Sequence, residues 1–270
     1  MVAPGSTRRQ TKNFLRQCAI GFCRVVLRLG SRPFVLRDEP AVVIAPHQDD
    51  ETLACGGLIA RKRNEGLPVH VIFITDGSAS HPHHSRLSPA AIATLRVQEA
   101  RRAAGQLGVE HTAVHFLDEP DATLKSITAD RRENLVARLA ALLESITPGE
   151  IFLPCQPDGS SEHDASVDFV LEAVARTTLH PDLWQYPVWS WWNPLLLLQG
   201  WLTTDDCRRQ AVEDFLPAKR AAIACYQSQI APLAPDSAPA LPSDLVAIFS
   251  SGTEYFFRRR IPEPPPPRSA

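Results

Sequence analysis

The chain has 270 residues, of which 44% are hydrophobic and 21% are charged, and this is enough material to bury one large core. A formal net charge of −2 gives no overall attraction to phosphates, so we expect no nucleic-acid partner. The six cysteines show neither C-x-x-C spacing nor the density of a disulfide-stapled domain, which predicts reduced thiols and a cytoplasmic location.

The first 37 residues form a region of their own, because they carry eight basic residues and no acidic one. Arginines interrupt the apolar stretch at 14–29, which therefore falls short of the roughly 20 mostly apolar residues of a membrane span. Two interpretations stay open: a basic amphipathic helix that docks on the domain or is solvated, and peripheral contact with an anionic membrane.

From residue 41 onward, short apolar runs rich in β-formers alternate with longer helical stretches. Strands are predicted at 41–45, 69–74, 113–117, 151–153 and 183–188, and helices near 53–64, 89–107, 128–145, 164–177 and 205–229. This alternation predicts a single-domain α/β fold with a Rossmann-like, mostly parallel sheet and helices on both faces. Ligands bind beyond the carboxyl ends of the strands in such a sheet, so site residues should directly follow strands.

The chain divides by composition into three parts. We expect a basic N-terminal extension over 1–37, one Rossmann-like domain over 38–230, and a proline-rich C-terminal segment and tail over 231–270. The sequence contains no internal repeat, so it indicates no second domain.

Polar and charged residues crowd the end of the first predicted strand, in the run His47-Gln48-Asp49-Asp50-Glu51. Burying an imidazole beside carboxylates is costly unless a divalent cation compensates their charge. Imidazole nitrogen with carboxylate oxygen suits Zn²⁺, and such a set also accepts Fe²⁺ or Co²⁺. One aspartate can bind the metal while its neighbour takes a proton from metal-bound water during attack on a carbonyl. Helix capping would explain the aspartates, but not His47.

Residues 45–53 resemble the A-H-P-D-D-E motif of the PIG-L/LmbE-like zinc de-N-acetylases, with Gln48 where proline is commoner. The resemblance implies that His47 and Asp50 ligate zinc and that Asp49 is the general base. It also implies the function of a metal-dependent amide hydrolase, a de-N-acetylase acting on linear amides. Its expected substrate is a small molecule that contains an N-acetylated amino sugar, similar to an N-acetylglucosaminide.

The run at 154–163 resembles the family's second motif, of the H-P-D-H kind, which begins a helix and whose last histidine completes the metal site. In that register His163 is the third metal ligand, and Glu162 stands where aspartate is usual. A capping-box pattern that begins at Ser161 is the local alternative for His163.

Ser160 is the main departure from the family pattern. It stands where the family often has a histidine associated with stabilising the tetrahedral intermediate or protonating the leaving amine. A serine hydroxyl can donate a hydrogen bond to an oxyanion, but it does not titrate near pH 7. We therefore expect Ser160 to stabilise the oxyanion and Asp49 to deliver the proton to the amine. A histidine from the loop at 80–84 is the other source of that proton.

Weaker similarities extend the resemblance over roughly residues 41–230. A T-D-G turn at 75–77 places a histidine-rich loop beside the site, where we predict that His81 binds substrate. Arg96, in an R-x-x-E-A pattern, resembles an arginine on the substrate side of the pocket, and Asp121 occupies the place of an aspartate near the sugar. A solvated loop, a solvated Arg/Glu helix pair and an ordinary turn remain the alternatives for these three residues.

Two other functions compete with amide hydrolysis. A nucleotide-binding Rossmann enzyme would need glycines directly after the first strand, where this chain has carboxylates. The stronger alternative is a metal-binding but catalytically impaired sugar-binding homologue, against which the presence of Asp49 argues. The tryptophans at 189, 191, 192 and 201 either stack on a sugar or, as we expect, fill the core.

Overall fold

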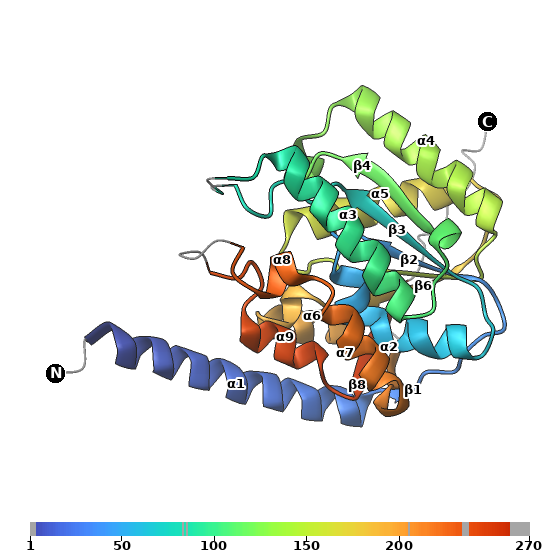
Figure 1. Cartoon of the computed structure of the whole chain (residues 1–270). Coiled ribbons are helices and arrows are strands. Elements are labelled where there is room, and N and C mark those ends of the chain that lie inside the picture. Colours follow the sequence, from blue (N-terminus) through green and yellow to red (C-terminus); the bar gives the residue numbers. More distant parts are fainter. Residues whose placement is uncertain (1–3, 83, 85, 205, 234–237, 260–270) are drawn as a thin grey trace, which may run out of the picture.

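The computed structural model describes residues 4–82, 84, 86–204, 206–233 and 238–259. These residues form one eight-stranded sheet with the strand order β1-β7-β8-β6-β5-β2-β3-β4 (Figure 1). The strands are β1 (Arg32–Pro33), β2 (Ala41–Ala45), β3 (Val69–Thr75), β4 (Val114–Glu119), β5 (Glu150–Pro154), β6 (Asp182–Tyr186), β7 (Cys207–Ala211) and β8 (Thr253–Arg259). Only the pairs that β8 forms, with β6 and with β7, are antiparallel. The predicted mostly parallel α/β sheet is thus confirmed.

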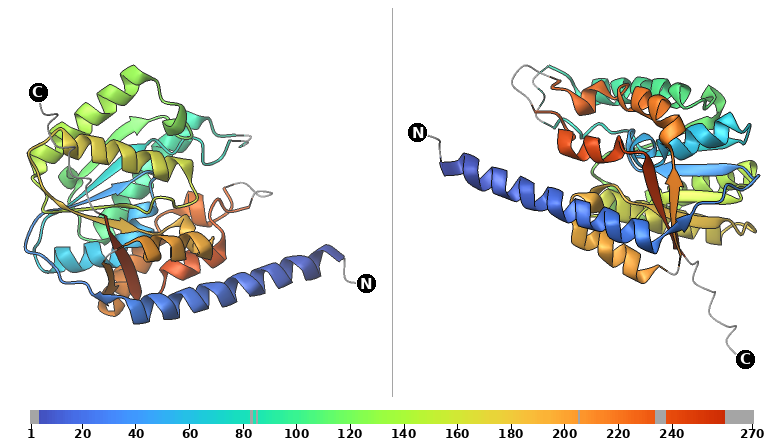
Figure 2. Two further views of the ribbon diagram at one scale, coloured as in Figure 1. Left: turned by 180° about the vertical axis from the view of Figure 1, so that it is seen from behind. Right: turned by 90° about the horizontal axis from the view of Figure 1, so that it is seen from below.

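Helices cover both faces of the sheet (Figures 1 and 2). They are α1 (Pro4–Gly30), α2 (Asp50–Asn64), α3 (Pro89–Gln106), α4 (Ala129–Ile146), α5 (Ser161–Ala175), α6 (Pro194–Thr203), α7 (Leu216–Ile223), α8 (Gln227–Ile230) and α9 (Ser243–Phe249). α2, α3 and α7 pack together on one face, and α4 packs on α5 on the other. Within the described residues, no helix is long and apolar enough to span a membrane.

The central strand β2 shows why the sheet is covered on both sides. All five of its residues are buried, and successive side chains point to opposite faces. Val43 therefore joins the core beneath α2 and α3, whereas Val42 and Ile44 join the core beneath α4 and α5. A continuous apolar run of this kind is typical of a parallel strand with helices on both faces.

The sequence analysis was wrong about the helical stretch near 205–229, whose first part is the strand β7. Arg208 and Arg209 lie in the middle of this strand, and their polarity hid it. Pairing with β1 on one side and β8 on the other stabilises this strand, so tertiary contacts override local preference.

The expected end of the domain at residue 230 falls short of the fold. β8 lies between β6 and β7, and α9 packs against α2. The side chains of Phe256 and Phe257 are buried in the main core. The structure thus places residues after the proline-rich segment in the middle of the sheet.

Candidate active site

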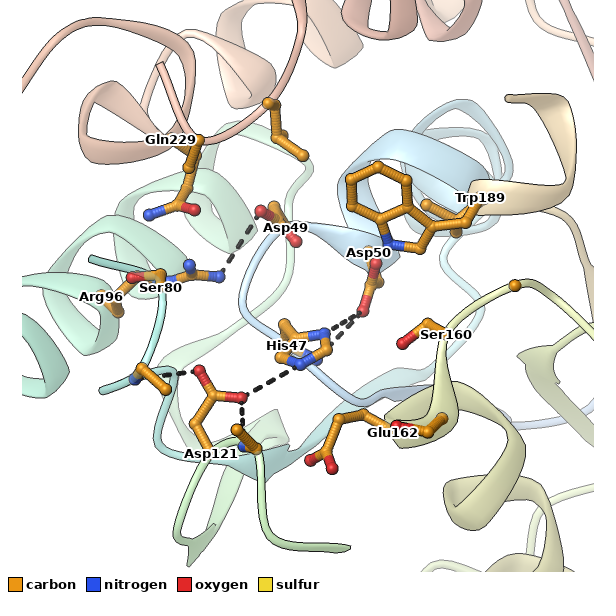
Figure 3. A pocket seen from close by; sticks show the side chains of 17 residues that line it. His47, Asp49, Asp50, Ser80, Arg96, Asp121, Ser160, Glu162, Trp189 and Gln229 are labelled. Carbon is orange, nitrogen blue, oxygen red and sulfur yellow. Dashed lines mark hydrogen bonds and ion pairs between the residues drawn. The ribbon is translucent and has the colours of Figure 1, made fainter. Parts of the chain in front are cut away.

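The loops that follow β2, β3, β4, β5 and β6 meet around a pocket of about 560 Å³ (Figure 3). Its polar lining residues are His47, Asp49, Asp50, Ser80, Arg96, Asp121, Ser160, Glu162 and Gln229. The chain leaves β2 toward β3 and later returns to β5 on the other side of β2. The pocket therefore lies at a point where the strand order reverses, which is where ligands bind in open parallel sheets.

Two histidines and an aspartate beside this pocket could hold a metal ion. His47 and Asp50 follow β2, while His163 lies in the first turn of α5, after β5. Oδ2 of Asp50 is 3.4 Å from Nδ1 of His47 and 3.2 Å from Nε2 of His163. One ligand atom from each of the three residues lies within 4.8 Å of the others. The structure brings together the three predicted ligands from segments more than 100 residues apart in the sequence.

Each histidine also contacts a second carboxylate through its other ring nitrogen. Nδ1 of His163 lies 2.7 Å from Asp158, and Nε2 of His47 lies 3.3 Å from Asp121. A proton on each of these nitrogens would leave the lone pair of the opposite nitrogen directed toward Asp50. Nε2 of His163 is buried and makes no hydrogen bond, although Asp50 lies close to it. An orphaned imidazole nitrogen in this position fits a metal ligand.

The charges around the two imidazoles favour a cation. Burial by itself would lower the pKa of His163, but Asp50 and Asp158 outweigh burial and raise this pKa to about 10. Burial opposes protonation of His47 in the same way, and its contacts with Asp121 and Asp50 raise its pKa to about 9. The surplus of carboxylates thus attracts positive charge, which a divalent cation supplies in place of protons.

Asp49 is buried beside this cluster and points to another side of the pocket, toward Arg96 (Figure 3). Its Oδ2 lies 3.4 Å from Nη2 of Arg96. Its φ of 156° and ψ of −27° are rare for a residue with a Cβ, and such conformations concentrate at functional sites. Burial raises the pKa of Asp49 to about 7, although the charge of Arg96 lowers it. Asp49 precedes α2 but makes no side-chain capping bond, so capping does not account for it.

Glu51 holds the turn that presents Asp49. One carboxylate oxygen accepts the backbone N–H of Asp49, and the other accepts the hydroxyls of Thr52 and Tyr226. Burial raises the pKa of Glu51 to about 7, despite these hydrogen bonds. Tyr226 lies between α7 and α8, and its contact with Glu51 links this later part of the chain to the turn that carries Asp49.

Arg96 and Glu99 do not form a solvated helix pair, because both side chains are buried and each has other partners. Nη2 of Arg96 donates to the backbone carbonyl of Gln48 at 2.6 Å. Glu99 accepts both the backbone N–H and the hydroxyl of Ser228. Arg96 lines the pocket, as its predicted role in substrate binding requires. It also contacts the loop that carries Asp49 and so helps to position that carboxylate.

The T-D-G turn at 75–77 shapes the neighbouring side of the pocket. Gly77 has a φ of +67°, and a Cβ on it would lie 2.4 Å from Oε1 of Gln48, so a side chain does not fit. Oδ1 of Asp76 accepts the backbone N–H of Ser78 and that of Asp121. The turn thus fixes Asp121 beside the pocket, and the hydroxyl of Thr75 donates to the carbonyl oxygen of Pro46 at 2.8 Å, just before His47.

The remaining predicted residues differ in how close they lie to the pocket. Ser160 and Glu162 line it. Ser160 is the N-cap residue of α5 and makes no side-chain capping bond, and Ser161 is already the first helical residue, so the capping box that was the alternative for His163 does not form. His81 is not among the lining residues, and its Nδ1 lies 3.1 Å from Oγ of Ser80, which does line the pocket. His83 lies outside the described residues.

Sequence reasoning missed Asp158. Its side chain is fully buried, and besides His163 it accepts the backbone N–H groups of residues 188, 189 and 190. Asp158 therefore ties the second motif to the loop after β6. The sequence shows an aspartate five positions before a predicted histidine ligand. This spacing alone does not predict that the two side chains are in contact.

The tryptophans divide between the core and the pocket. Trp191 is buried in the main core. Trp192 and Trp201 are half-buried and pack against that core. Trp189 lines the pocket, and it is therefore the tryptophan that could stack on a sugar.

Comparison with known proteins identifies the class. The profile of the family described as PIG-L, GlcNAc-PI de-N-acetylase, matches residues 42–174. The chain belongs to the PIG-L family. A diacetylchitobiose deacetylase of Thermococcus kodakarensis is 28% identical over 135 residues, 49% of this chain and 48% of that protein. A 1D-myo-inositol 2-acetamido-2-deoxy-alpha-D-glucopyranoside deacetylase of Mycobacterium sp. strain KMS is 28% identical over 163 residues, 54% and 51% of the two chains. The chain spans about half the length of these curated relatives.

Solved structures share the fold. An N,N'-diacetylchitobiose deacetylase from Pyrococcus horikoshii aligns with a TM-score of 0.58 and 19% identity, over 88% of this chain and 90% of that one. The 4-carboxy-2-hydroxymuconate hydratase GalB from Pseudomonas putida KT2440 aligns with a TM-score of 0.61 and 20% identity, over 78% and 83%. Because these two proteins carry out different reactions, the shared fold by itself does not assign one to this chain.

Proposed function

We propose that this protein is a metal-dependent amide hydrolase that removes an N-acetyl group from a substrate similar to an N-acetylglucosaminide. The observation that carries the proposal is that buried Asp49 lines the same pocket as His47 and Asp50, which form a cluster with His163. The ligand set suits Zn²⁺, and Fe²⁺ or Co²⁺ are accepted by the same atoms. When bound there, such a cation would polarise the acetyl carbonyl and lower the pKa of a water molecule.

Asp49 acts as the general base in this proposal. Its carboxylate takes a proton from the attacking water, and it then delivers that proton to the nitrogen of the leaving amine. A carboxyl whose pKa lies near 7 can do both, because neither protonation state is strongly preferred at neutral pH. The charge of Arg96, whose Nη2 lies 3.4 Å from Oδ2 of Asp49, lowers this pKa and so favours the ionised carboxyl.

Ser160 is proposed to stabilise the oxyanion. Its hydroxyl makes no capping bond and lines the pocket on the side of α5, so it is free to donate a hydrogen bond to a substrate oxygen. His81 does not line the pocket, and its Nδ1 lies 3.1 Å from Oγ of Ser80, so the proposed contact between His81 and substrate requires this loop to move.

The proposed substrate class rests on the pocket and on the relatives. A volume of about 560 Å³ is in the range of small-molecule sites, which span roughly 300–1,000 Å³. Asp121 and Gln229 offer polar atoms for sugar hydroxyls, and Trp189 offers an aromatic face. Both curated relatives are named for substrates that carry an N-acetylated glucosamine unit.

The test measures acetate released from N,N'-diacetylchitobiose and N-acetylglucosamine by the Zn²⁺-loaded protein. We expect release by the wild type and a loss of about 100-fold or more in Asp49→Asn, with the metal content unchanged. A conservative change at exposed Asp168, Asp168→Asn, is the matched control and should keep full activity.

The same assay separates the proposal from a catalytically impaired sugar-binding homologue. If the wild-type protein binds metal and sugar but releases no acetate from any N-acetylated sugar, it is the impaired sugar-binding homologue. Acetate release that persists in metal-loaded Asp49→Asn would show that another group is the base.

A further inference from the structure

We propose that the outer face of α1, together with α6, binds the surface of an anionic lipid bilayer. This surface consists of the exposed large hydrophobic residues of the described chain, and all of them lie in α1, in α6 or shortly after α1. They are Phe14, Leu15, Phe22, Val25, Leu29, Val35, Leu195 and Leu202. We refer to these eight side chains as the apolar surface.

α1 is apolar on two opposite sides. Its buried residues Ile20, Cys23 and Leu27 pack on the core of the domain. The exposed residues Phe14, Phe22, Val25 and Leu29 follow helical spacing and fall on the side turned away from those three. The inward side explains how α1 docks. Leu29 is 83% exposed and Phe22 is 62% exposed, so these outward side chains are left uncovered by the described part of the chain.

α6 widens the apolar surface beyond a single helix. It lies beside α1, with Sγ of Cys23 3.8 Å from the carbonyl oxygen of Pro194 (Figure 2). The sequence of α6, Pro-Leu-Leu-Leu-Leu-Gln-Gly-Trp-Leu-Thr, contains no charged residue, and Leu195 is 77% exposed. Single exposed hydrophobic residues are common on protein surfaces, but a patch that extends over two helices indicates an interaction site.

The N-terminal region that carries most of this surface is basic. Residues 1–37 carry eight basic residues, and all 30 acidic residues lie in the rest of the chain. Arg28 is exposed on α1, and the guanidinium of Arg16 lies 3.8 Å from the ring centroid of Trp192. Exposed Phe and Leu with flanking arginines and neighbouring tryptophans are typical of helices that lie in the interface of anionic membranes.

A second copy of the chain fits the apolar surface less well. The described residues expose large hydrophobics nowhere else, so a dimer would have to pair this surface with itself. That pairing would set the arginines of one α1 near those of the other, with no acidic residue in either helix to compensate them. Anionic lipid headgroups supply the missing negative charge.

Vesicle flotation with the full chain tests the proposal, and it measures binding without any use of the active site. We expect the protein to float with vesicles of phosphatidylcholine mixed with phosphatidylglycerol, and not with phosphatidylcholine alone. Added salt should weaken the binding, because it screens charges at the bilayer surface. The test is therefore independent of the proposed deacetylase activity.

Two substitutions in the apolar surface give the decisive comparison. Phe22→Ser combined with Leu29→Ser should weaken partition by at least about tenfold, because less apolar area enters the interface. Phe22→Leu combined with Leu29→Met should retain binding. Since both side chains are exposed, the thermal unfolding of either double variant should match that of the wild type.

A charge pair completes the design. Arg28→Gln should weaken binding to anionic vesicles, and Arg102→Gln, at an equally exposed arginine of α3, should not. Wild-type protein that ignores anionic vesicles, or a serine double variant that binds them as well as wild type, would overturn the proposal. A concentration-dependent dimer that the serine double variant loses, without vesicle binding, would assign the apolar surface to a second copy instead.

Discussion

Each histidine of the candidate metal site contacts a carboxylate on the ring nitrogen that faces away from Asp50. Asp158 and Asp121 thereby set which nitrogen carries the proton and how each ring is oriented. Asp158 is the more constrained of the two, because its oxygens also accept three backbone N–H groups of the 188–190 loop. The affinity of the site for a metal should therefore depend on residues that are not ligands.

Asp158→Asn tests this dependence. The amide oxygen can still accept the N–H groups of residues 188 and 190, but the amide nitrogen cannot accept from Trp189 or His163, and the side chain no longer balances the charge of His163. We expect the affinity for Zn²⁺ to fall by about 10- to 100-fold, measured by competition with a chromogenic chelator. Asp168→Asn, on the exposed side of α5, should leave the affinity unchanged. Equal affinities of the two variants for Zn²⁺ would show that Asp158 does not contribute to metal binding.

The pKa of Asp49 predicts the acid limb of the pH profile. A general base must be deprotonated, so kcat/KM should rise as the pH increases through the pKa of Asp49, which is about 7 without a bound cation. A cation in the site would move this limb to lower pH. Because the positive charge of Arg96 lowers the pKa of Asp49, Arg96→Gln should move the limb to higher pH and Arg96→Lys should not. A limb that stays in place in Arg96→Gln would contradict the assignment of Asp49.

Among the elements, β8 joins parts of the chain that are distant in sequence. Oε1 of Glu254 accepts the backbone N–H of Gly57 and the ammonium of Lys219, both at 2.7 Å, and Oε2 accepts the N–H of Leu58. Glu254 and Lys219 are both buried, so this ion pair links β8, α2 and α7 out of contact with water. The backbone of α2 lies so close to Val212 at this point that a Cβ on Gly57 would be 2.4 Å from the Val212 side chain.

Removing one partner of this pair should be costly. Glu254→Ala leaves the charge of Lys219 buried and unpaired, so the free energy of unfolding should fall by about 3–5 kcal/mol, measured in urea. Glu65→Ala removes the exposed partner of Arg61, and it should change the same quantity by about 1 kcal/mol or less. Similar losses in both variants would show that the buried pair contributes no more than a surface pair.

At the scale of the whole molecule, β8 joins the two parts of the sheet. β8 is the last of the described strands in the sequence. It pairs with β6 on one side and with β7 on the other, so it lies inside the sheet. β7 and β1 are joined to the rest of the sheet only through β8. The aromatic residues of β8 also belong to the core beneath α2 and α3.

A chain that ends at residue 230 should therefore fail to fold. It would lose a central strand and expose the edges of β6 and β7, which favours aggregation. A chain that ends at residue 259 keeps every described strand and should remain folded. Soluble yield and cooperative thermal unfolding measure the difference, and a cooperative transition in the shorter chain would show that the sheet closes without β8.

The sequence alone determined the elements from β2 to β6, because long apolar runs with helical stretches between them leave few alternatives. It also indicated His47 and Asp50, which follow a strand closely, and the resemblance of residues 154–163 to the family's second motif added His163. It could not locate β7, whose arginines mask a strand, or place β8 inside the sheet.

What only the tertiary structure decided concerns partners that are distant along the chain. Asp158 was not expected because its role depends on the rotation of one imidazole, which no local pattern encodes. The burial of Arg96 and Glu99 depends on the loop of Asp49 and on Ser228, which approach from other segments. Local periodicity thus determined which residues follow strands, and packing between distant segments decided which atoms these residues contact.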